Sequence, residues 1–493
     1  MATPNTHHGP ERIHRYLHTS SANRQSDTVV FFIGAGGIMM SSLALLTHRA
    51  GFTVAGSDRT ETPLTRTLEE DGIVMSYGHS TANLDRWPTC ALVVYTVAIS
   101  PDNPEYVRAM ERGIPLVSRA DYVGYLMTHY QNRVGVAGMH GKSTCTSMCA
   151  QLFMSAKADP TVLSGAEYAP MGGAYRIGGD THFLFEACEY MDSFLDFRPT
   201  VAVLLNIELE HVDYFKSIEQ ICDSFSRFAS LTGEGGTVIY NLDDPITVKA
   251  AMDARVGRRV SFSLNDPTAD FYARVADPEA AFPQFAVYHK GAYLFDVTLP
   301  VTGLHQVYNA LAATASAHAC GLPLADCKAG LEAFKGAGRR MEYKGTVAGA
   351  EVYDDYAHHP TEIRSTLAGA AHLCHSRHPD GRLFCVFQPH TYSRTAALFD
   401  DFVSAFDAAD RLLLIDIYAA RETNTYGVSS KGLAEAIGSR ALYCDSIEAT
   451  VAQLLNELTP HDLLVVMGAG DVIHVTQQLK PYMNNTEPAC INQ

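Results

Sequence analysis

The sequence lacks the features that mark membrane, secreted and nucleic-acid-binding proteins. No run of 18 apolar residues occurs in its 493 residues, so we expect no membrane span. From Met1 to about Asp27 the chain is polar and has no apolar core of a signal peptide, so we expect no export. Basic residues number 37 against 54 acidic ones, a formal net charge of −17, which argues against a nucleic-acid partner. An anionic substrate would have to be held by local basic clusters.

Cysteine patterns typical of disulfide frameworks and zinc sites are also missing. The 11 cysteines are scattered without a C-x-x-C pair, which favours a reduced, cytoplasmic compartment. Cys145 and Cys149 lie four residues apart, and packing on one helix face explains them. No internal repeat or low-complexity run occurs. With 47% hydrophobic residues, a chain of this length is expected to bury large cores in about three domains.

A glycine-rich loop is the most informative motif that is present. Gly138 to Ser143 follows the apolar run 134–137 and precedes a polar, helix-compatible segment, which is where a phosphate-binding loop lies. Backbone N–H groups of such a loop surround a polyphosphate, Lys142 can reach the terminal phosphates, and the Ser143 hydroxyl can bind Mg²⁺. The full pattern has glycine where this chain has Val136, so a glycine turn with a surface lysine is the alternative.

A second glycine turn follows the first predicted strand. The strand over 28–33 leads into Gly34-Ala35-Gly36-Gly37, then a helix and a second strand that precedes Asp58. This layout, with an acidic residue 22 positions after Gly36, is typical of a dinucleotide-binding half. Met39 occupies the place of the third glycine of that motif, which argues against NAD binding. An NAD-dependent dehydrogenase is kept as an alternative interpretation.

The rest of the chain continues the alternation of apolar runs and helix-compatible segments, which predicts doubly wound α/β sheets. Further strands are predicted over 52–55, 91–98, 183–185, 201–207, 351–353, 383–387, 411–415 and 463–467. Glu186 and His211 follow two of these strands, where such sheets place metal and ligand groups. Glu186 is interpreted as an Mg²⁺ ligand or a solvated strand end, and His211 as a metal or phosphate ligand or a capping residue.

The densest polar cluster runs from Asp354 to Glu362 and combines carboxylates, histidines and a tyrosine. Such residues are poor core material, so the cluster predicts a site. His390 and Arg394 follow the next strand in the same way and are expected at the same carboxyl edge. The pair Arg339-Arg340 is interpreted as a phosphate clamp, with a solvated pair as the alternative.

The order of these motifs resembles that of the muramyl ligases, ATP-dependent enzymes that append amino acids to the UDP-muramate precursor of peptidoglycan. The similarity spans about 29–475 and is carried by Gly34–Ser41, Gly138–Thr144, Asn206–Asp213, Gly303–Asn309, Arg339–Arg340, Asp354–Glu362 and His390–Arg394. It implies an α/β protein of three domains: a Rossmann-like UDP-sugar-binding domain over 1–122, a P-loop-type ATP-binding domain over 123–340, and a Rossmann-like amino-acid-binding domain over 341–493.

The resemblance also implies ATP and Mg²⁺ as cofactors, and UDP-N-acetylmuramate and L-alanine as substrates that are joined through an acyl phosphate by a monomer or homodimer. Attachment of the tripeptide L-Ala-γ-D-Glu-meso-diaminopimelate during cell-wall recycling is the alternative. The implied catalytic residues are Lys142, His211, Arg340 and His358, and the implied metal ligands are Ser143, Glu186 and His211. The implied ATP site comprises Gly138, Met139, His140, Gly141, Lys142, Ser143, Thr144, His305, Asn309 and Arg339. The implied substrate sites comprise Gly36, Gly37, Ser57, Asp58, His79, Tyr356, His358, His390 and Arg394.

The chain departs from the usual family pattern at several of these positions, which are Met39, Ser42, Met139, Ser143, Cys188 and Gln306. A serine hydroxyl can replace that of threonine on Mg²⁺. Two rivals explain less of the chain. A dehydrogenase leaves the phosphate loop unexplained, and a nucleotide-dependent switch protein leaves the polar cluster at Asp354 to Glu362 without a role.

Overall fold

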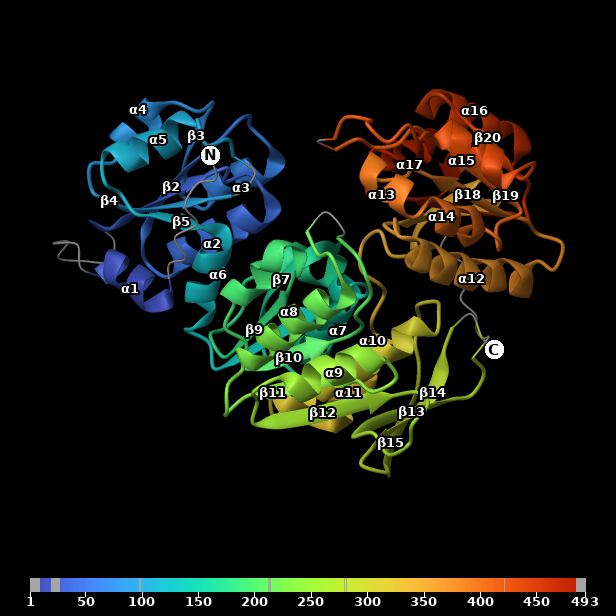
Figure 1. The fold of residues 1–493 in the computed structure, drawn as a ribbon, viewed down its shortest axis with the longest axis horizontal. Coiled ribbons are helices and arrows are strands. Elements are labelled where there is room, and N and C mark those ends of the chain that lie inside the picture. The colour runs from blue at the N-terminus through green and yellow to red at the C-terminus, as the bar shows by residue number, and fades with distance from the viewer. Residues whose placement is uncertain are drawn as a thin grey trace. The chain divides into compact units, whose positions relative to one another are not determined.

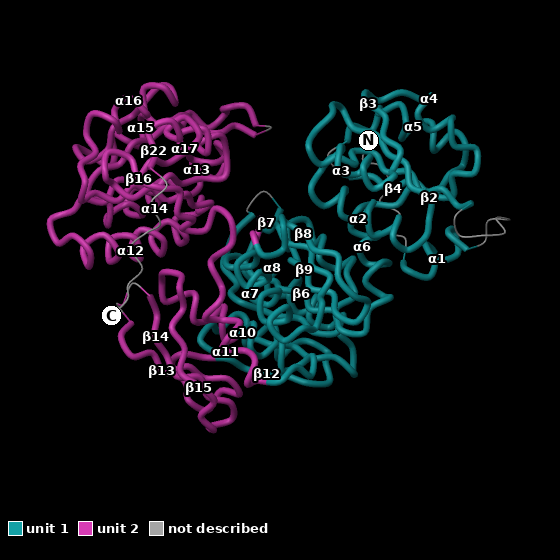
Figure 2. The backbone as a smooth tube through the Cα atoms, turned by 180° about the vertical axis from the view of Figure 1, so that it is seen from behind, with its two compact units in different colours: residues 1–165, 170–262, 312–323 teal, residues 166–169, 263–311, 324–493 magenta. Residues whose placement is uncertain are grey.

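The computed structural model describes residues 9–18, 27–96, 99–211, 214–278, 280, 282–420 and 422–484 (Figure 1). Two compact units make up the chain: unit 1 comprises residues 1–165, 170–262 and 312–323, and unit 2 comprises residues 166–169, 263–311 and 324–493 (Figure 2). Within the described ranges, no helix has both the length and the apolar character needed to cross a membrane.

Unit 1 contains a five-stranded parallel sheet with the order β3-β2-β1-β4-β5. Its strands are β1 (Val29–Ile33), β2 (Thr53–Asp58), β3 (Val74–Tyr77), β4 (Cys90–Tyr95) and β5 (Leu116–Ser118). The associated helices are α2 (Ile38–Arg49), α3 (Pro63–Glu70), α4 (Thr81–Asp85), α5 (Pro104–Glu111) and α6 (Arg119–Met127). Strand order reverses beside β1, as in dinucleotide-binding halves.

Two strand ends in this sheet differ from the sequence prediction. Strand β2 was expected to end at residue 55 but continues to Asp58, because it pairs with β3 through Ser57 and Asp58. Strand β4 ends at Tyr95, and residues 97 and 98 of the predicted strand lie outside the described residues. The extension of β2 places Asp58 at the carboxyl end of the sheet, beside the glycine turn.

A second sheet of unit 1 has the order β12-β11-β10-β6-β9-β7-β8. Its strands are β6 (Asn132–Ala137), β7 (Thr161–Tyr168), β8 (Gly173–Arg176), β9 (His182–Glu186), β10 (Val201–Leu204), β11 (Thr237–Asn241) and β12 (Arg258–Ser263). The associated helices are α7 (Lys142–Ser155), α8 (Ile218–Ser230) and α9 (Pro245–Asp253), whereas α1 (Pro10–His18) contacts α6 and β4 of the five-stranded sheet. Strand β6 lies between β10 and β9, with Ala137 opposite Leu204 and Val136 opposite Glu186. The segments that follow these three strands therefore leave the sheet at one edge.

Unit 2 contains three antiparallel strands that the sequence pattern did not predict: β13 (Phe271–Val275), β14 (Gln284–His289) and β15 (Ala292–Thr298). Strand β13 interrupts its apolar residues with Arg274, whereas β14 and β15 contain short apolar runs over 285–288 and 292–295 that were not recognised as strands from the sequence. Helix α11 (Leu324–Glu332) contacts β15. Helix α10 (His305–Ala319) starts in unit 2, and its residues from 312 onward belong to unit 1.

The large sheet of unit 2 has the order β20-β19-β18-β21-β17-β16-β22. Its strands are β16 (Glu342–Val347), β17 (Ala350–Asp355), β18 (Leu383–Phe387), β19 (Arg411–Leu414), β20 (Ala441–Tyr443), β21 (Leu463–Met467) and β22 (Met483–Asn484). The helices are α12 (Pro360–Arg377), α13 (Tyr392–Ala397), α14 (Phe399–Ala405), α15 (Ser430–Ile437), α16 (Ile447–Glu457) and α17 (Ile473–Leu479). Strands β18 and β21 match the predicted runs to the residue.

Register within this sheet brings the predicted polar segments to one edge. Strand β21 lies between β17 and β18, and Met467 at its end pairs with both Asp355 and Phe387. The loops after β17, β18 and β21 therefore start at the same level. The expectation that the cluster after β17 and the segment after β18 share a carboxyl edge is confirmed.

Candidate active site

The predicted phosphate loop joins β6 to α7, and its two glycines adopt backbone conformations that other residues rarely adopt. Gly138 has φ of +153°, and a Cβ there would lie 2.9 Å from Leu205 Cβ. Gly141 has φ of +82° and caps α7 without a side-chain hydrogen bond. Thr144 is buried in the first turn of that helix. The amide groups at this helix start thus have no side-chain cap, as in loops that bind anions.

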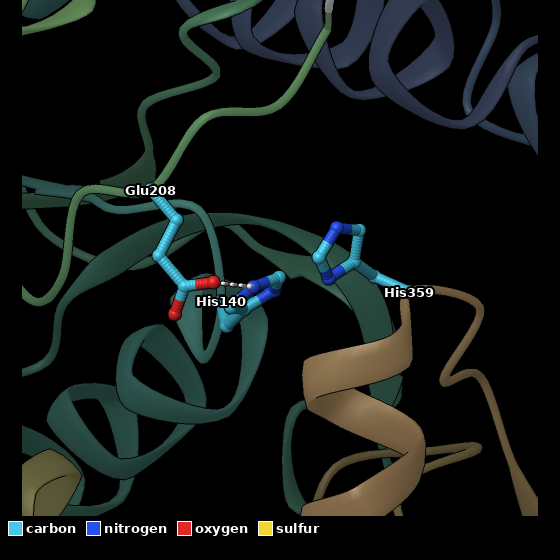
Figure 3. A group of neighbouring side chains, drawn as sticks. All are labelled: His140, Glu208 and His359. Carbon is cyan, nitrogen blue, oxygen red and sulfur yellow. Dashed lines mark ion pairs between the residues drawn. The ribbon is translucent and has the colours of Figure 1, made fainter. Parts of the chain in front are cut away.

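Asn206, which follows β10, fixes the loop. Its Oδ1 accepts from the His140 N–H at 2.8 Å, its Nδ2 donates to the His140 carbonyl at 3.0 Å, and its own carbonyl accepts from Met139 N–H at 3.1 Å. The His140 ring faces Glu208, with Nε2 3.7 Å from Oε2 (Figure 3). The loop is therefore held in shape by the neighbouring strand end.

Lys142 lies across the loop and makes an ion pair with Glu189. Its Nζ donates to the carbonyls of Gly138 at 2.6 Å and Met139 at 3.1 Å, and lies 3.1 Å from Glu189 Oε2. Burial lowers the pKa of Lys142, but the nearby carboxylates, Glu189 above all, outweigh burial and keep the pKa above its ordinary value. The lysine is charged throughout the physiological range.

Ser143 and Glu186, predicted to share a magnesium ion, are in direct contact. The Ser143 hydroxyl donates to Glu186 Oε2 at 2.8 Å, and the same oxygen accepts from the Gly165 N–H at 2.9 Å. The chemistry of this pair, a hydroxyl and a carboxylate oxygen, matches what Mg²⁺ prefers. A Cβ on Gly165 would lie 2.7 Å from Glu186 Oε2, so glycine is required for that close approach.

His211 is joined to the same group through Glu189. Its Nε2 lies 3.0 Å from Glu189 Oε1, and its ring centroid lies 4.9 Å from that of Tyr190. Burial would raise the pKa of Glu189, yet Lys142 and His211 lower it to about 2. His211 has φ of +53°, a strained conformation for histidine. Such strain is concentrated at functional sites, which supports the interpretation of this segment as one.

The residues predicted to bind the UDP-sugar lie close together around the glycine turn after β1. Gly36 N–H donates to Asp58 Oδ2 at 2.7 Å, and a Cβ on Gly36 would lie 2.8 Å from that oxygen. Ser57 Oγ lies 3.5 Å from His79 Nδ1, which in turn lies 2.7 Å from Glu105 Oε2. Gly37 caps α2 without a side-chain hydrogen bond. The predicted UDP-sugar residues therefore form one group in unit 1.

In unit 2, the start of α10 carries the two residues predicted near the adenine. His305 is exposed, and its Nδ1 lies 2.9 Å from Ser365 Oγ. Asn309 is buried and donates to Gln306 Oε1 at 3.0 Å. The departure from the family pattern at Gln306 thus lies between the two predicted contacts, since Gln306 Nε2 is also 2.9 Å from His305 Nε2.

The two predicted phosphate-clamp arginines have different surroundings. Arg339 Nε lies 3.2 Å from Asp354 Oδ2, and its Nη2 donates to the Gly468 carbonyl at 2.7 Å. Arg340 Nη1 lies 4.0 Å from Glu362 Oε1. Both guanidinium groups lie over the Tyr356 ring, at 5.0 Å and 5.3 Å from its centroid. Such contacts suit arginine, whose planar cation stacks on aromatic faces.

The remaining predicted substrate residues meet at the carboxyl edge of the large sheet. The ring centroid of His358 lies 5.6 Å from that of Tyr356 and 5.9 Å from that of His390. Burial, followed by the nearby Arg394, lowers the pKa of His390. The backbone at Thr391 has φ of +69°, a strained turn between His390 and Arg394. Tyr356, His358, His390 and Arg394 thus belong to one neighbourhood within unit 2.

Three buried carboxylates lie around these groups: Asp355 belongs to the polar cluster predicted from the sequence, but neither Glu105 nor Glu189 was named there as a site residue. Glu189 joins Lys142 to His211, and Glu105 accepts from His79 and from Asn83 Nδ2, the latter at 2.7 Å. Asp355 accepts from the backbone N–H groups of two neighbours, and burial raises its pKa to about 6 despite Arg340. The contacts of Glu189 and Glu105 reach 47 and 26 residues along the sequence, so only the fold identifies these two.

Three family models match the chain in series. The model described as Mur ligase family, catalytic domain, matches residues 29–131. The Mur ligase middle domain matches residues 136–317, and the Mur ligase, glutamate ligase domain, matches residues 339–470. The predicted α/β architecture of three domains is confirmed, whereas the boundaries at 122/123 and 340/341 stay predictions.

Individual relatives are similar over most of their length. The chain is 43% identical over 456 residues to the UDP-N-acetylmuramate–L-alanine ligase of Agathobacter rectalis, covering 91% of this chain and 97% of that protein. It is 43% identical over 457 residues to the enzyme of the same name from Lachnospira eligens, with the same coverage of 91% and 97%.

Two solved structures share the fold. The UDP-N-acetylmuramate–alanine ligase of Thermotoga maritima matches with a TM-score of 0.74 and 25% identity, over 92% of this chain and 98% of that one. The murein peptide ligase of Psychrobacter arcticus matches with a TM-score of 0.66 and 25% identity, over 93% and 99%. The similarity in sequence and fold therefore extends across both units.

Proposed function

This chain belongs to the Mur ligase family, and on that premise we propose that it joins L-alanine to UDP-N-acetylmuramate while converting ATP to ADP and phosphate. The observation that carries the proposal is the phosphate loop with its Ser143–Glu186 pair, in a chain 43% identical to proteins named as L-alanine ligases. The product is a precursor of peptidoglycan, and the reaction takes place in the cytoplasm.

ATP is held by the loop from Gly138 to Thr144, whose uncapped helix start offers N–H groups to the phosphates. Lys142 offsets negative charge as the γ-phosphoryl group moves, because a charged ammonium already lies at the loop. His305 and Asn309 contact the adenine. Arg340 serves the phosphates more directly than Arg339, because two donors of Arg339 are engaged by Asp354 and the Gly468 carbonyl.

Ser143, Glu186 and His211 would hold Mg²⁺. Two observations support this metal site. The oxygens of Ser143 and Glu186 lie 2.8 Å apart, and the His211 imidazole is held by Glu189, which also contacts Lys142. Bound there, Mg²⁺ would supply positive charge that favours the approach of two anions, the nucleotide and the carboxylate. Glu189 accepts from both neighbours and thereby orients the His211 ring.

UDP-N-acetylmuramate is bound through Gly36, Gly37, Ser57, Asp58 and His79. The close contact of Gly36 with Asp58 leaves no space for a side chain in the turn. The lactyl carboxylate takes the γ-phosphoryl group of ATP, forming an acyl phosphate and releasing ADP. The amine of alanine then attacks the carbonyl carbon, and phosphate leaves as the amide forms.

The amino acid is bound by Tyr356, His358, His390 and Arg394. Arg394 pairs with its carboxylate, because a guanidinium matches that group with two parallel hydrogen bonds. His358 Nδ1 lies 3.0 Å from the Tyr356 carbonyl, which can only accept, so this nitrogen carries the proton and the basic lone pair is on Nε2. His358 can therefore take the proton that the attacking amine loses.

The test follows the oxygen atoms. UDP-N-acetylmuramate labelled with ¹⁸O in its carboxylate is incubated with the full-length protein, ATP, Mg²⁺ and L-alanine, and the released phosphate is analysed by mass spectrometry. The proposal expects one ¹⁸O in each phosphate, because the carboxylate oxygen leaves with the phosphoryl group. Phosphate without label, released at the same rate when the UDP-sugar is omitted, would mean simple ATP hydrolysis.

A further inference from the structure

Glu189 is a buried carboxylate that contacts two proposed site residues. Its side chain is only 1% exposed, with Oε2 3.1 Å from Lys142 Nζ and Oε1 3.0 Å from His211 Nε2. It follows β9, and it directly precedes the short 3₁₀ segment Tyr190–Asp196. A carboxylate so deeply buried costs free energy unless it is paired. Here Oε1 accepts from Lys142 and His211, whereas Oε2 has the Lys142 ammonium nearby but no hydrogen-bond partner within the described residues.

Contacts made by Lys142 show what this pairing does to the loop. An ammonium has three N–H donors, and Lys142 directs them to Gly138, Met139 and Glu189. Its positive charge is therefore balanced by a carboxylate inside the protein before any nucleotide is bound. A polyphosphate that approaches the loop meets a neutral ion pair, and also the negative charge of Glu186 beside Ser143.

We propose that Glu189 is a positioning residue that makes the phosphate loop select nucleotide carrying its divalent cation over metal-free nucleotide. The inference rests on the proposed function, because it assumes that the loop binds ATP. A metal-free polyphosphate has to compete with Glu189 for Lys142 and is repelled by both carboxylates. A nucleotide that brings a divalent cation adds positive charge, for which the same carboxylates are favourable neighbours.

The turn that carries Glu189 has anchors of its own, so the effect can be separated from folding. Asp192 accepts from the Tyr214 hydroxyl at 2.8 Å and from the Ser224 hydroxyl, and its N–H donates to the Glu189 carbonyl at 2.9 Å. These contacts involve neither carboxylate oxygen of Glu189. A glutamine at position 189 keeps the shape of the side chain, removes its charge and replaces one acceptor oxygen with an NH₂ donor.

The experiment measures ATP binding to the full-length protein by isothermal titration calorimetry, once with Mg²⁺ and once with EDTA. In the wild type, we expect the dissociation constant in EDTA to exceed that with Mg²⁺ by a large factor. Glu189→Gln should lower the dissociation constant in EDTA at least about tenfold, since removing a unit charge close to the phosphates is worth at least that factor at an effective dielectric constant of about 20. Glu189→Asp keeps the charge and should keep most of the discrimination.

A matched control is Glu105→Gln, which removes the charge of another fully buried carboxylate that is paired with a histidine. This variant changes the net charge equally and should leave metal-free ATP binding as in the wild type. Thermal unfolding checks that each variant is folded, and Glu189→Met is a second neutral variant of similar length should glutamine not be tolerated.

The outcomes separate the inference from the proposed function. A wild type that binds no ATP even with Mg²⁺ would overturn the nucleotide-binding role of the loop and the inference together. A wild type that binds ATP with Mg²⁺, with a Glu189→Gln variant whose dissociation constant in EDTA is unchanged or higher, would overturn the inference alone. An equal decrease of the dissociation constant in EDTA for Glu105→Gln would also overturn the inference, because the effect would then reflect the net charge of the protein.

Discussion

Replacing Arg339 with alanine should destabilise unit 2 by about 3 to 5 kcal/mol, because it leaves the fully buried carboxylate of Asp354 without its cation. The guanidinium donates to Asp354 and to the Gly468 carbonyl, so it joins β17 to the segment after β21. Asp354→Asn should cost less, about 1 to 3 kcal/mol, because Arg339 is 21% exposed and can be hydrated.

The double variant, Arg339→Ala with Asp354→Asn, should be more stable than Arg339→Ala alone, since no buried charge is left unpaired. Burial raises the pKa of Asp354, and Arg339 opposes that rise. Without Arg339 the pKa should rise further, so the carboxyl group protonates more readily and the loss of stability should shrink as the pH falls. Urea unfolding at pH 5 and pH 8 measures this dependence, and hydrogen exchange of the β17 amides locates it.

Two results would refute this reasoning. A cost below about 1 kcal/mol for Arg339→Ala would mean that the pair is no more than a surface ion pair. Strict additivity in the double variant would mean that the two side chains do not interact. Unchanged stability with greatly weakened ATP binding would instead favour the phosphate-clamp role that the sequence suggested for Arg339.

Three further predictions follow from the site. Lys142→Ala should lower kcat by orders of magnitude in a folded protein, measured by phosphate release and circular dichroism, and near-normal turnover would contradict the phosphate-loop assignment. Arg394→Ala should raise the KM for alanine far more than the KM for ATP, and Arg394→Lys should restore the KM for alanine only in part. An equal increase of both KM values would place Arg394 at the phosphates. The Asp355 carboxyl, with its pKa raised to about 6 by burial, binds its proton more tightly in the folded state than in the unfolded state. Its contribution to stability, up to about 3 kcal/mol, is therefore present below about pH 4 and is lost as the pH rises through 6. Asp355→Asn should flatten the pH dependence of the urea midpoint between pH 4.5 and 7. An unchanged pH dependence in this variant would disprove the assignment.

Parallel strands buried on both faces could be predicted from the sequence because they are continuous apolar runs. Strands β18 and β21 are predicted to the residue, since polar segments border each run. Strands β13 to β15 were not predicted. Strand β13 carries Arg274 on its exposed face, and the apolar runs of β14 and β15 are only four residues long. Their pairing is set by contacts between strands rather than by local composition.

Within the site, motif residues could be predicted but their buried partners could not. Gly138, Lys142 and Ser143 are recognisable because loop geometry requires those residue types at that spacing. Glu189 is one of several acidic residues near β9, and only its contacts with Lys142 and His211 distinguish it. The left-handed conformation of His211 likewise has no signature in the sequence.

The central claim is tested most directly by a competition between amino donors. The full-length protein is incubated with ATP, Mg²⁺, UDP-N-acetylmuramate and equimolar amounts of L-alanine and L-Ala-γ-D-Glu-meso-diaminopimelate. The UDP-linked products are then separated by chromatography and identified and quantified by mass spectrometry. The account predicts UDP-N-acetylmuramoyl-L-alanine as the dominant product, with one ADP formed for each amide bond. Dominant formation of the tripeptide product would contradict it, and the chain would then be a ligase of cell-wall recycling.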